Sequence, residues 1–186
     1  MNQINKTFRA FICIEFPDEV IKEVARIQSL IEKQNFTGKL TELENLHLTL
    51  KFLGEINPET LEKIKEKLKT IKLPVLNLQL SCVGTFNFRG SPKIVWVKVT
   101  GNIFNLQKEI DKVLLDIFQS EERFMSHLTI ARIRYVKDKE GFIDYVNQIK
   151  IKPIKFQVNS FKLKLSELKP EGPVYTNLEI YSLKER

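Results

Sequence analysis

Histidine occurs only twice in this chain of 186 residues, and both copies begin the same tripeptide, His-Leu-Thr. The first is His47 in "ENLHLTLKFLGEI" (44–56), and the second is His127 in "FMSHLTIARIRYV" (124–136). An imidazole has an ordinary pKa of about 6.5, so it can hold or release a proton near neutral pH. Two histidines brought together could therefore supply the general base and the general acid of one reaction.

The threonine of each tripeptide adds a hydrogen-bond donor on the same side. In a β-strand residues i and i+2 share a face, so Thr49 points the same way as His47, and Thr129 the same way as His127. A threonine hydroxyl can donate to an anionic oxygen about 3 Å away. Two such strands facing each other would suit a phosphate. One neutral histidine would take a proton from water and one imidazolium would protonate the leaving oxygen, each step typically worth roughly 10²–10⁴ in rate.

Other interpretations of the histidines are weaker. A single histidine on a strand is more often a polar residue with satisfied hydrogen bonds than a catalyst, but two identical tripeptides use the whole histidine content. A zinc site needs three or four ligands, and the sequence has no third histidine and no CxxC or HExxH motif. No motif surrounds a serine or cysteine nucleophile. The pattern therefore favours acid–base chemistry without a metal.

The elements that must position these residues follow from the hydrophobic periodicity. Alternation of apolar and polar residues predicts strands at 8–16, 46–53, 75–86, 94–99, 127–133, 155–168 and 173–183. Helical spacing predicts helices at about 17–31, 57–70, 102–118 and 138–150. The segment 35–43 is predicted to be a polar connection, Gly54 to end its strand, and 89–93 to form a turn. The last two strands are expected to pair as a closing hairpin.

This order of elements predicts an α+β fold with antiparallel or mixed sheets. Each His-Leu-Thr strand is followed by a charged helix, which suggests two similar half-domains that face each other. No Pro-, Gly- or Ser-rich linker interrupts the chain, so residues 1–186 are expected to form one domain.

The composition is that of a globular protein with a positive surface. The net charge is +7 and the pI is about 9.3, which favours an anionic partner such as nucleic acid but also fits a lysine-rich solvated surface. Cys13 and Cys82 lie in apolar segments and are predicted to be buried, reduced thiols. The chain shows no signal-peptide pattern and no apolar run near the roughly 18–20 residues that cross a membrane. We therefore expect a cytoplasmic protein that does not bind a membrane.

Four blocks of the sequence resemble a known family. They are "FRAFICIEFP" (8–17), "ENLHLTLKFLGE" (44–55), "SPKIVWVKV" (91–99) and "SHLTIARI" (126–133). Two His-x-Thr-x motifs about eighty residues apart are the signature of the two-histidine (2H) phosphoesterases. With these flanks the chain resembles the RNA 2′,3′-cyclic phosphodiesterases, also called 2′-5′ RNA ligases. The last fifty residues match mainly as a strand pattern.

The resemblance implies a bilobal α+β fold, with a basic cleft between two sheets, helices on the outer faces, and neither a metal nor another cofactor. It implies hydrolysis of a 2′,3′-cyclic phosphate to a 2′-phosphate. His47 would then be the proton donor to the leaving O3′, and His127 the acceptor that activates water. Thr49 and Thr129 would bind the phosphate oxygens. The motifs are nearly symmetric, so the assignment of donor and acceptor comes from the resemblance alone.

Arg132 is a further candidate for phosphate binding, because the family also has arginine at this place. Strict alternation puts it on the opposite face from His127, so this role requires a bulge, a strand end or a long reach. By the same alternation Lys51 is expected to be a charge at the rim of the cleft, and Phe52 to lie in the core. Arg9 is left open between the cleft and solvent.

Three aromatic residues, Phe86, Phe88 and Tyr135, could stack on a base. The chain contains thirteen phenylalanines, so core packing is the prediction for any one of them.

The expected partners are RNA ends that carry a 2′,3′-cyclic phosphate, with tRNA halves as one candidate, and the reverse ligase reaction is a minor activity. We expect a monomer, because a central cleft needs no second subunit. The alternatives are another cyclic nucleotide or RNA 3′ end as substrate, or a non-catalytic RNA-binding module. The last of these predicts one broken motif, whereas both motifs are intact here.

Overall fold

The computed structural model describes residues 7–170 and 172–184, and within them the strands form two antiparallel sheets. The four-stranded sheet has the order β3 (Leu48–Ile56), β1 (Phe8–Ile14), β8 (Ser160–Lys169) and β9 (Gly172–Ser182). The five-stranded sheet has the order β2 (Phe36–Leu40), β6 (His127–Val136), β5 (Ser91–Gly101), β4 (Leu76–Phe88) and β7 (Lys155–Val158). The α+β class and the antiparallel option for both sheets are thereby confirmed.

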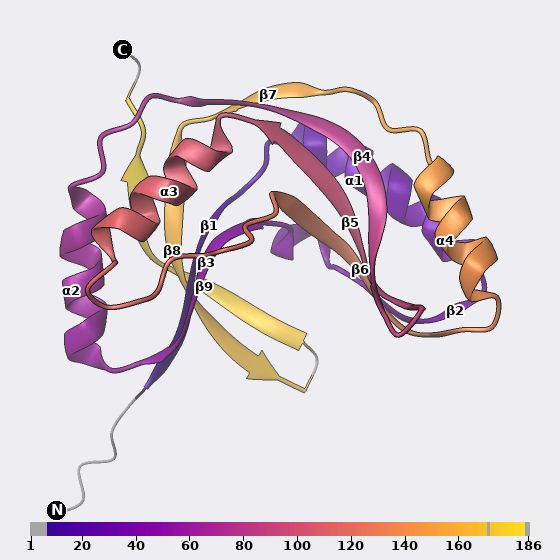
Figure 1. Cartoon of the computed structure of the whole chain (residues 1–186), viewed down its shortest axis with the longest axis horizontal. Coiled ribbons are helices and arrows are strands. Elements are labelled where there is room, and N and C mark those ends of the chain that lie inside the picture. The colour runs from indigo at the N-terminus through magenta and orange to yellow at the C-terminus, as the bar shows by residue number, and fades with distance from the viewer. Residues whose placement is uncertain (1–6, 171, 185–186) are drawn as a thin grey trace, which may run out of the picture.

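Helices cover the outer faces of both sheets. The helices are α1 (Asp18–Glu32), α2 (Pro58–Lys69), α3 (Ile103–Val113) and α4 (Lys139–Gln148). Helices α2 and α3 pack on the four-stranded sheet, and α1 and α4 pack on the five-stranded sheet. Figure 1 shows the two sheets curving toward each other between these pairs of helices. The bilobal arrangement expected from the family resemblance is present.

The two lobes have matching topology. The order β3-β1-β8-β9 in one sheet corresponds to β6-β5-β4-β7 in the other, with β2 added at the edge. The helix after β1 crosses to the five-stranded sheet, and the helix after β5 crosses to the four-stranded sheet. The pseudo-duplicated halves expected from the sequence are therefore interleaved, and each sheet takes strands from both halves of the chain.

Most predicted elements are confirmed, and the local signals explain their ends. Helix α2 begins after Asn57, whose side chain accepts a hydrogen bond from the backbone N–H of Thr60 at 2.8 Å. The turn after β4 needs only two residues, Arg89 and Gly90, which both have positive φ angles. This is the geometry of a tight hairpin turn, so β5 begins at Ser91, earlier than expected.

Three element predictions were wrong. Segment 35–43 contains the edge strand β2, and the 3₁₀ helix Leu43–Asn45 begins at its end. Residues 36–40 form a strand without apolar alternation because β6 pairs with their backbone N–H and C=O groups. Gly54 does not end β3, because its φ of +68° lets the strand continue to Ile56. Segment 155–168 divides at residue 159 into β7 and β8, which belong to different sheets. Helix α3 is also shorter than the predicted 102–118.

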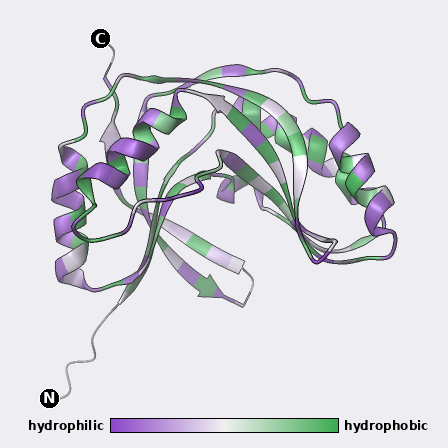
Figure 2. Ribbon diagram, in the orientation of Figure 1, coloured by the Kyte–Doolittle hydropathy of each residue, from purple (hydrophilic) through white to green (hydrophobic). Residues whose placement is uncertain are grey.

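The core anchors the strands that carry the tripeptides. Leu48, Leu50, Leu128 and Ile130, the apolar residues of the two motifs, are at most 1% exposed. Apolar and polar residues alternate along the strands and helices, as Figure 2 shows. Burial of each such side chain contributes roughly 1.5–3 kcal/mol relative to exposure, so the histidines and threonines between them are held on rigid backbone. In the described residues no helix is long and apolar enough to cross a membrane.

Candidate active site

The two histidines are held in the same way. The Nδ1 atom of His47 lies 2.7 Å from the carbonyl oxygen of Asn45, and the Nδ1 atom of His127 lies 2.7 Å from the carbonyl oxygen of Met125. A carbonyl oxygen only accepts hydrogen bonds, so each Nδ1 carries the hydrogen. Each ring therefore keeps Nε2 for chemistry, as an acceptor when neutral and as a donor when charged.

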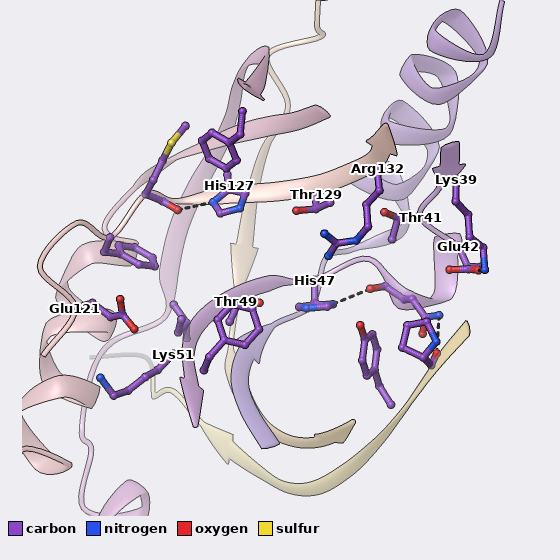
Figure 3. A pocket seen from close by; sticks show the side chains of 18 of the residues that line it. Lys39, Thr41, Glu42, His47, Thr49, Lys51, Glu121, His127, Thr129 and Arg132 are labelled. Carbon is purple, nitrogen blue, oxygen red and sulfur yellow. Dashed lines mark hydrogen bonds and ion pairs between the residues drawn. The ribbon is translucent and has the colours of Figure 1, made fainter. Parts of the chain in front are cut away.

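The five predicted site residues meet in one cavity of about 510 Å³ between the sheets, a size that suits a nucleotide-sized ligand. The described residues that line it include, beside His47, Thr49, His127, Thr129 and Arg132, the side chains of Lys39, Thr41, Glu42, Asn45, Phe52, Phe86, Glu121, Arg123, Phe124, Met125 and Tyr175. Figure 3 shows His127, Thr129 and Arg132 along one strand, across the cavity from His47 and Thr49. His47 itself immediately precedes β3.

A β-bulge brings Arg132 to the cavity. On β6 the pairing with β5 shifts from Trp96–Thr129 to Val95–Ala131, so Ile130 is an extra residue in the ladder. A bulge reverses the alternation of side chains beyond it. Arg132 therefore points to the same face as Thr129, which resolves the conflict between its expected role and strict alternation.

The equivalent bulge in the other motif corrects two predictions. On β3 the pairing with β1 shifts from Cys13–Thr49 to Ile12–Lys51, which makes Leu50 the extra residue. Lys51 then extends toward Asp111 on α3 and, although it is among the residues that line the cavity, it is only 3% exposed, so the expectation of a rim charge was wrong. Phe52 turns to the cavity and is 70% exposed, so the expectation of a core residue was also wrong.

Buried Lys51 joins the first motif strand to the segment that leads into the second. Its Nζ atom donates to Oδ1 of Asp111 on α3 at 2.6 Å and to the carbonyl oxygen of Gln119 at 2.7 Å. The other carboxylate oxygen of Asp111 accepts from Gln107 and from the backbone N–H of Glu121. Burial by itself raises the pKa of Asp111, but these hydrogen bonds outweigh it and lower that pKa.

Aromatic rings pack against both imidazoles. The ring of Phe11 lies 4.8 Å from that of His47, and Tyr175 meets His47 edge-on at 5.2 Å. Phe86 meets His127 edge-on at 4.9 Å. The prediction of core packing for Phe86 was thus only half right, because the ring is partly buried and also lines the cavity.

A charged cluster lies on the same sheet as His47. Glu15 forms ion pairs with both Lys162 and Lys164 on β8. Burial lowers the pKa of His47, and the charge of Lys164 lowers it further, against the hydrogen bond to the Asn45 carbonyl, which raises it. His47 is therefore biased toward the neutral imidazole in the free protein.

The remaining candidates fall outside the cavity. Arg9 is exposed on β1 and is not among the lining residues described. Cys13 is buried and its pKa is raised by burial to about 12, whereas Cys82 is exposed, against the prediction. Phe88 and Tyr135 are each 61% exposed, so the prediction of core packing was wrong for both.

Sequence reasoning missed Tyr175 and Asp111. Tyr175 lies on β9, more than a hundred residues from the histidine that it contacts, and its strand shows only an alternating pattern. Asp111 is one acid among the 23 acidic residues of the chain, and only its burial beside Lys51 sets it apart. No group of metal-ligating residues occurs in the part of the chain that the structure describes.

A family model places this geometry among known proteins. The model described as LigT-like phosphoesterase matches the chain twice, over residues 14–96 and 97–175, so each match contains one His-Leu-Thr tripeptide. Among solved structures, the protein TT0787 of Thermus thermophilus superposes with a TM-score of 0.78 at 26% identity, covering 96% of this chain and 99% of that one. Escherichia coli LigT, solved with 3′-AMP, has the same fold with a TM-score of 0.73 at 22% identity, covering 97% and 100%.

Curated relatives agree over almost the whole length. The RNA 2′,3′-cyclic phosphodiesterase of Methanocaldococcus jannaschii is 32% identical over 171 residues, covering 90% of this chain and 96% of that protein. The protein of the same name from Thermotoga maritima is 33% identical over 172 residues, covering 90% and 91%. The chain therefore belongs to the LigT-like phosphoesterase family, within the two-histidine phosphoesterases.

Proposed function

We propose that the protein is an RNA 2′,3′-cyclic phosphodiesterase that hydrolyses terminal cyclic phosphates to 2′-phosphates. The observation that carries the proposal is the matched pair of histidines, each with Nδ1 anchored on a backbone carbonyl and each beside a threonine in one cavity. The activity named for the curated relatives at 32–33% identity supports the same reaction.

In this mechanism the cyclic phosphate binds between the two motif strands. The hydroxyls of Thr49 and Thr129 donate to its non-bridging oxygens, and the guanidinium of Arg132 offsets its negative charge. These groups are set before the substrate arrives, because bulges and buried leucines fix the strands. These side chains therefore need not reorganise when negative charge develops on the oxygens bound to phosphorus, and they stabilise that charge.

The two histidines then divide the proton transfers. Neutral His127 takes a proton from a water molecule through Nε2 as the water oxygen attacks phosphorus. The bond from phosphorus to O3′ breaks, and imidazolium His47 gives its Nε2 proton to O3′, which leaves a 2′-phosphate and a free 3′-hydroxyl. Burial lowers the pKa of His47, and the negative charge of the bound phosphate would favour the imidazolium that this step uses.

The test is to incubate the protein with a dinucleotide 2′,3′-cyclic phosphate in EDTA and to identify the product by phosphorus NMR. We expect a 2′-phosphate from the wild type and loss of turnover by roughly 10²–10⁴ in His47→Ala and in His127→Ala. Lys137→Gln, an exposed change past the end of β6, is the matched control and should keep full activity.

Each other outcome would redirect the proposal. A 3′-phosphate product would mean that the acid faces O2′, so the polarity would be reversed. Activity that EDTA abolishes would contradict a reaction run by histidines alone. No turnover by the wild type, with RNA binding retained, would favour another phosphoester substrate or the binding module.

We further propose that the enzyme acts as a cytoplasmic monomer on RNA fragments, with tRNA halves as one candidate substrate. Every group in the mechanism comes from one chain, and the exposed Cys82 thiol suits a reducing compartment. Light scattering together with activity measured across dilution tests the monomer. A specific activity that falls on dilution would contradict it.

A further inference from the structure

Outside the cavity, the two most exposed aromatic side chains of the described residues lie on the five-stranded sheet and have no part in the mechanism above. Phe88 on β4 and Tyr135 on β6 are each 61% exposed. The guanidinium of Arg89 lies 5.2 Å from the centre of the Phe88 ring, and the exposed Arg134 precedes Tyr135. We call these four residues, Phe88, Arg89, Arg134 and Tyr135, the aromatic rim.

The rim lies on the cavity side of the five-stranded sheet. Phe88 shares its face of β4 with Phe86, which contacts His127 in the cavity. Tyr135 pairs with Thr37 on β2, and the neighbouring Phe36 packs on α4 behind the sheet. Thr37 and Tyr135 therefore point away from that helix and toward the cavity side.

Strand register places the two rings at the same level. Phe88 pairs with Ser91, which lies three residues before Ile94, and Ile94 pairs with Arg132. Tyr135 lies three residues after Arg132. The two residues therefore lie two strands apart at one end of the sheet, where the strand spacing separates their backbones by about 10 Å. Figure 1 shows the β4–β5 turn reaching the same end as the β6–β2 edge.

The rim continues the site along one strand. Thr129 and Arg132 line the cavity, and Tyr135 lies six residues beyond Thr129. Ile130 and Arg134 are extra residues in the ladders to β5 and β2, so this stretch is shorter than the roughly 20 Å of six regular strand residues. Arg132 and Arg134 lie on this strand, Arg89 lies in the turn between β4 and β5, and the three give this end of the sheet positive charge. Aromatic rings interleaved with arginines suit a single-stranded nucleic acid, because the rings stack on bases and the guanidiniums pair with phosphates.

We propose that the aromatic rim binds the nucleotides that precede the cyclic phosphate, so that the enzyme prefers oligonucleotide ends over dinucleotides. The inference rests on the proposed function, because it assumes that the terminal phosphate lies between the two histidines. The cavity of about 510 Å³ holds only the end of such a chain. The upstream bases then lie over Phe88 and Tyr135 without sequence selection, since every base has a stacking face.

The experiment compares kcat/KM for a dinucleotide and for a hexanucleotide, both ending in a 2′,3′-cyclic phosphate. We expect the wild type to favour the hexanucleotide by about tenfold or more, and Phe88→Ala with Tyr135→Ala to remove that preference while dinucleotide turnover stays unchanged. Arg89→Gln and Arg134→Gln should each reduce the salt dependence of hexanucleotide binding by about 0.7 in log–log slope. Leu115→Ala, at 63% exposure and outside both sheets, is the matched control.

A second measurement separates this inference from the proposed function. Fluorescence anisotropy reports binding of a labelled hexanucleotide that ends in a 2′-phosphate, whether or not the protein turns over. If the hexanucleotide binds, the rim variants weaken that binding and the wild type shows no turnover, the proposed reaction would be overturned while the aromatic rim would remain an RNA-binding surface. Equal kcat/KM for both lengths, or rim variants that lose both substrates equally, would overturn the surface. Self-association lost in the rim variants, with RNA binding unchanged, would assign the rim to a second copy of the chain.

Discussion

The Nζ atom of Lys51 lies 2.6 Å from Oδ1 of Asp111, and the two side chains are only 2% and 9% exposed. Lys51 is four residues after His47 along the chain. Asp111 also holds the backbone N–H of Glu121, in the segment that leads to His127. One buried ion pair in the wall of the cavity therefore ties the two motifs together.

Lys51→Met should destabilise the protein by about 3–5 kcal/mol, because it leaves the Asp111 carboxylate buried without its cation. The lowered pKa of Asp111 means that its contribution to stability is present above the unfolded pKa of about 3.9 and is lost as pH falls through the folded value. Without Lys51 that pKa should rise. The loss should therefore be largest at pH 7 and smaller at pH 4, where Asp111 of the variant takes up a proton while the wild-type contribution is still largely present, as measured by urea unfolding.

The control for this prediction is an exposed pair on α2. Lys63 and Glu59 lie 2.7 Å apart with 62% and 79% exposure. Lys63→Met should have little effect on the free energy of unfolding, because water already solvates both charges. Equal losses in the Lys51 and Lys63 variants would contradict the view that burial makes the Lys51–Asp111 pair important.

Thr49→Val should lower kcat/KM on the dinucleotide by roughly 10–100-fold, whereas Thr49→Ser should retain most of it. Valine keeps the shape of threonine but removes the hydroxyl that donates to phosphate, and a hydrogen bond to a charged group is worth about 1.5–3 kcal/mol. Serine keeps that donor. The same pair of changes at Thr129 should behave alike. If the serine variants instead had a lower kcat/KM than the valine variants, activity would depend on side-chain volume, and the threonines would be packing residues.

The sequence predicted that each histidine and its threonine share a face, because these residues lie before the bulge in each strand. Up to Leu50 and Ile130 the alternation is regular, so i and i+2 share a face as expected. Beyond the bulge the pattern reverses, and Lys51 and Phe52 exchange their expected sides. A bulge is set by pairing with a neighbouring strand that is distant in the sequence, so local periodicity does not reveal it.

The same limit explains the errors in the fold. Segment 36–40 reads as a polar connection, yet it is a strand because β6 supplies its hydrogen bonds. Residues 155–168 read as one continuous strand, yet they pass from one sheet to the other at residue 159. Local composition indicates that a segment forms a strand, whereas the neighbouring strand with which it pairs depends on the packing of the whole core.

Arg132→Gln should lower kcat/KM on the dinucleotide by roughly 10–100-fold, because the bulge at Ile130 places its charge beside the phosphate. The neighbouring change Arg134→Gln removes the same charge two residues further on, outside the cavity lining. On the dinucleotide it should have little effect. Equal losses from the two variants would mean that Arg132 contributes only to the general positive field.

The assignment of His47 as proton donor can be tested through its pKa. The chain has only two histidines, so proton NMR follows both imidazoles directly. We expect the His47 pKa to lie below 6.5 in the free protein, and Lys164→Met to raise it by removing a nearby positive charge. Lys164→Arg keeps the charge and should leave the pKa low.

Activity then separates the donor from the acceptor. Above its pKa, the charged fraction of His47 falls tenfold for each pH unit, so a donor role requires that raising this pKa increases kcat/KM at about pH 7.5. If His47 is instead the acceptor, it is already neutral at that pH. Lys164→Met would then leave kcat/KM unchanged at pH 7.5 and lower it at about pH 5, because more of the base would be protonated. That second result would exchange the roles of His47 and His127 while leaving the two-histidine mechanism intact.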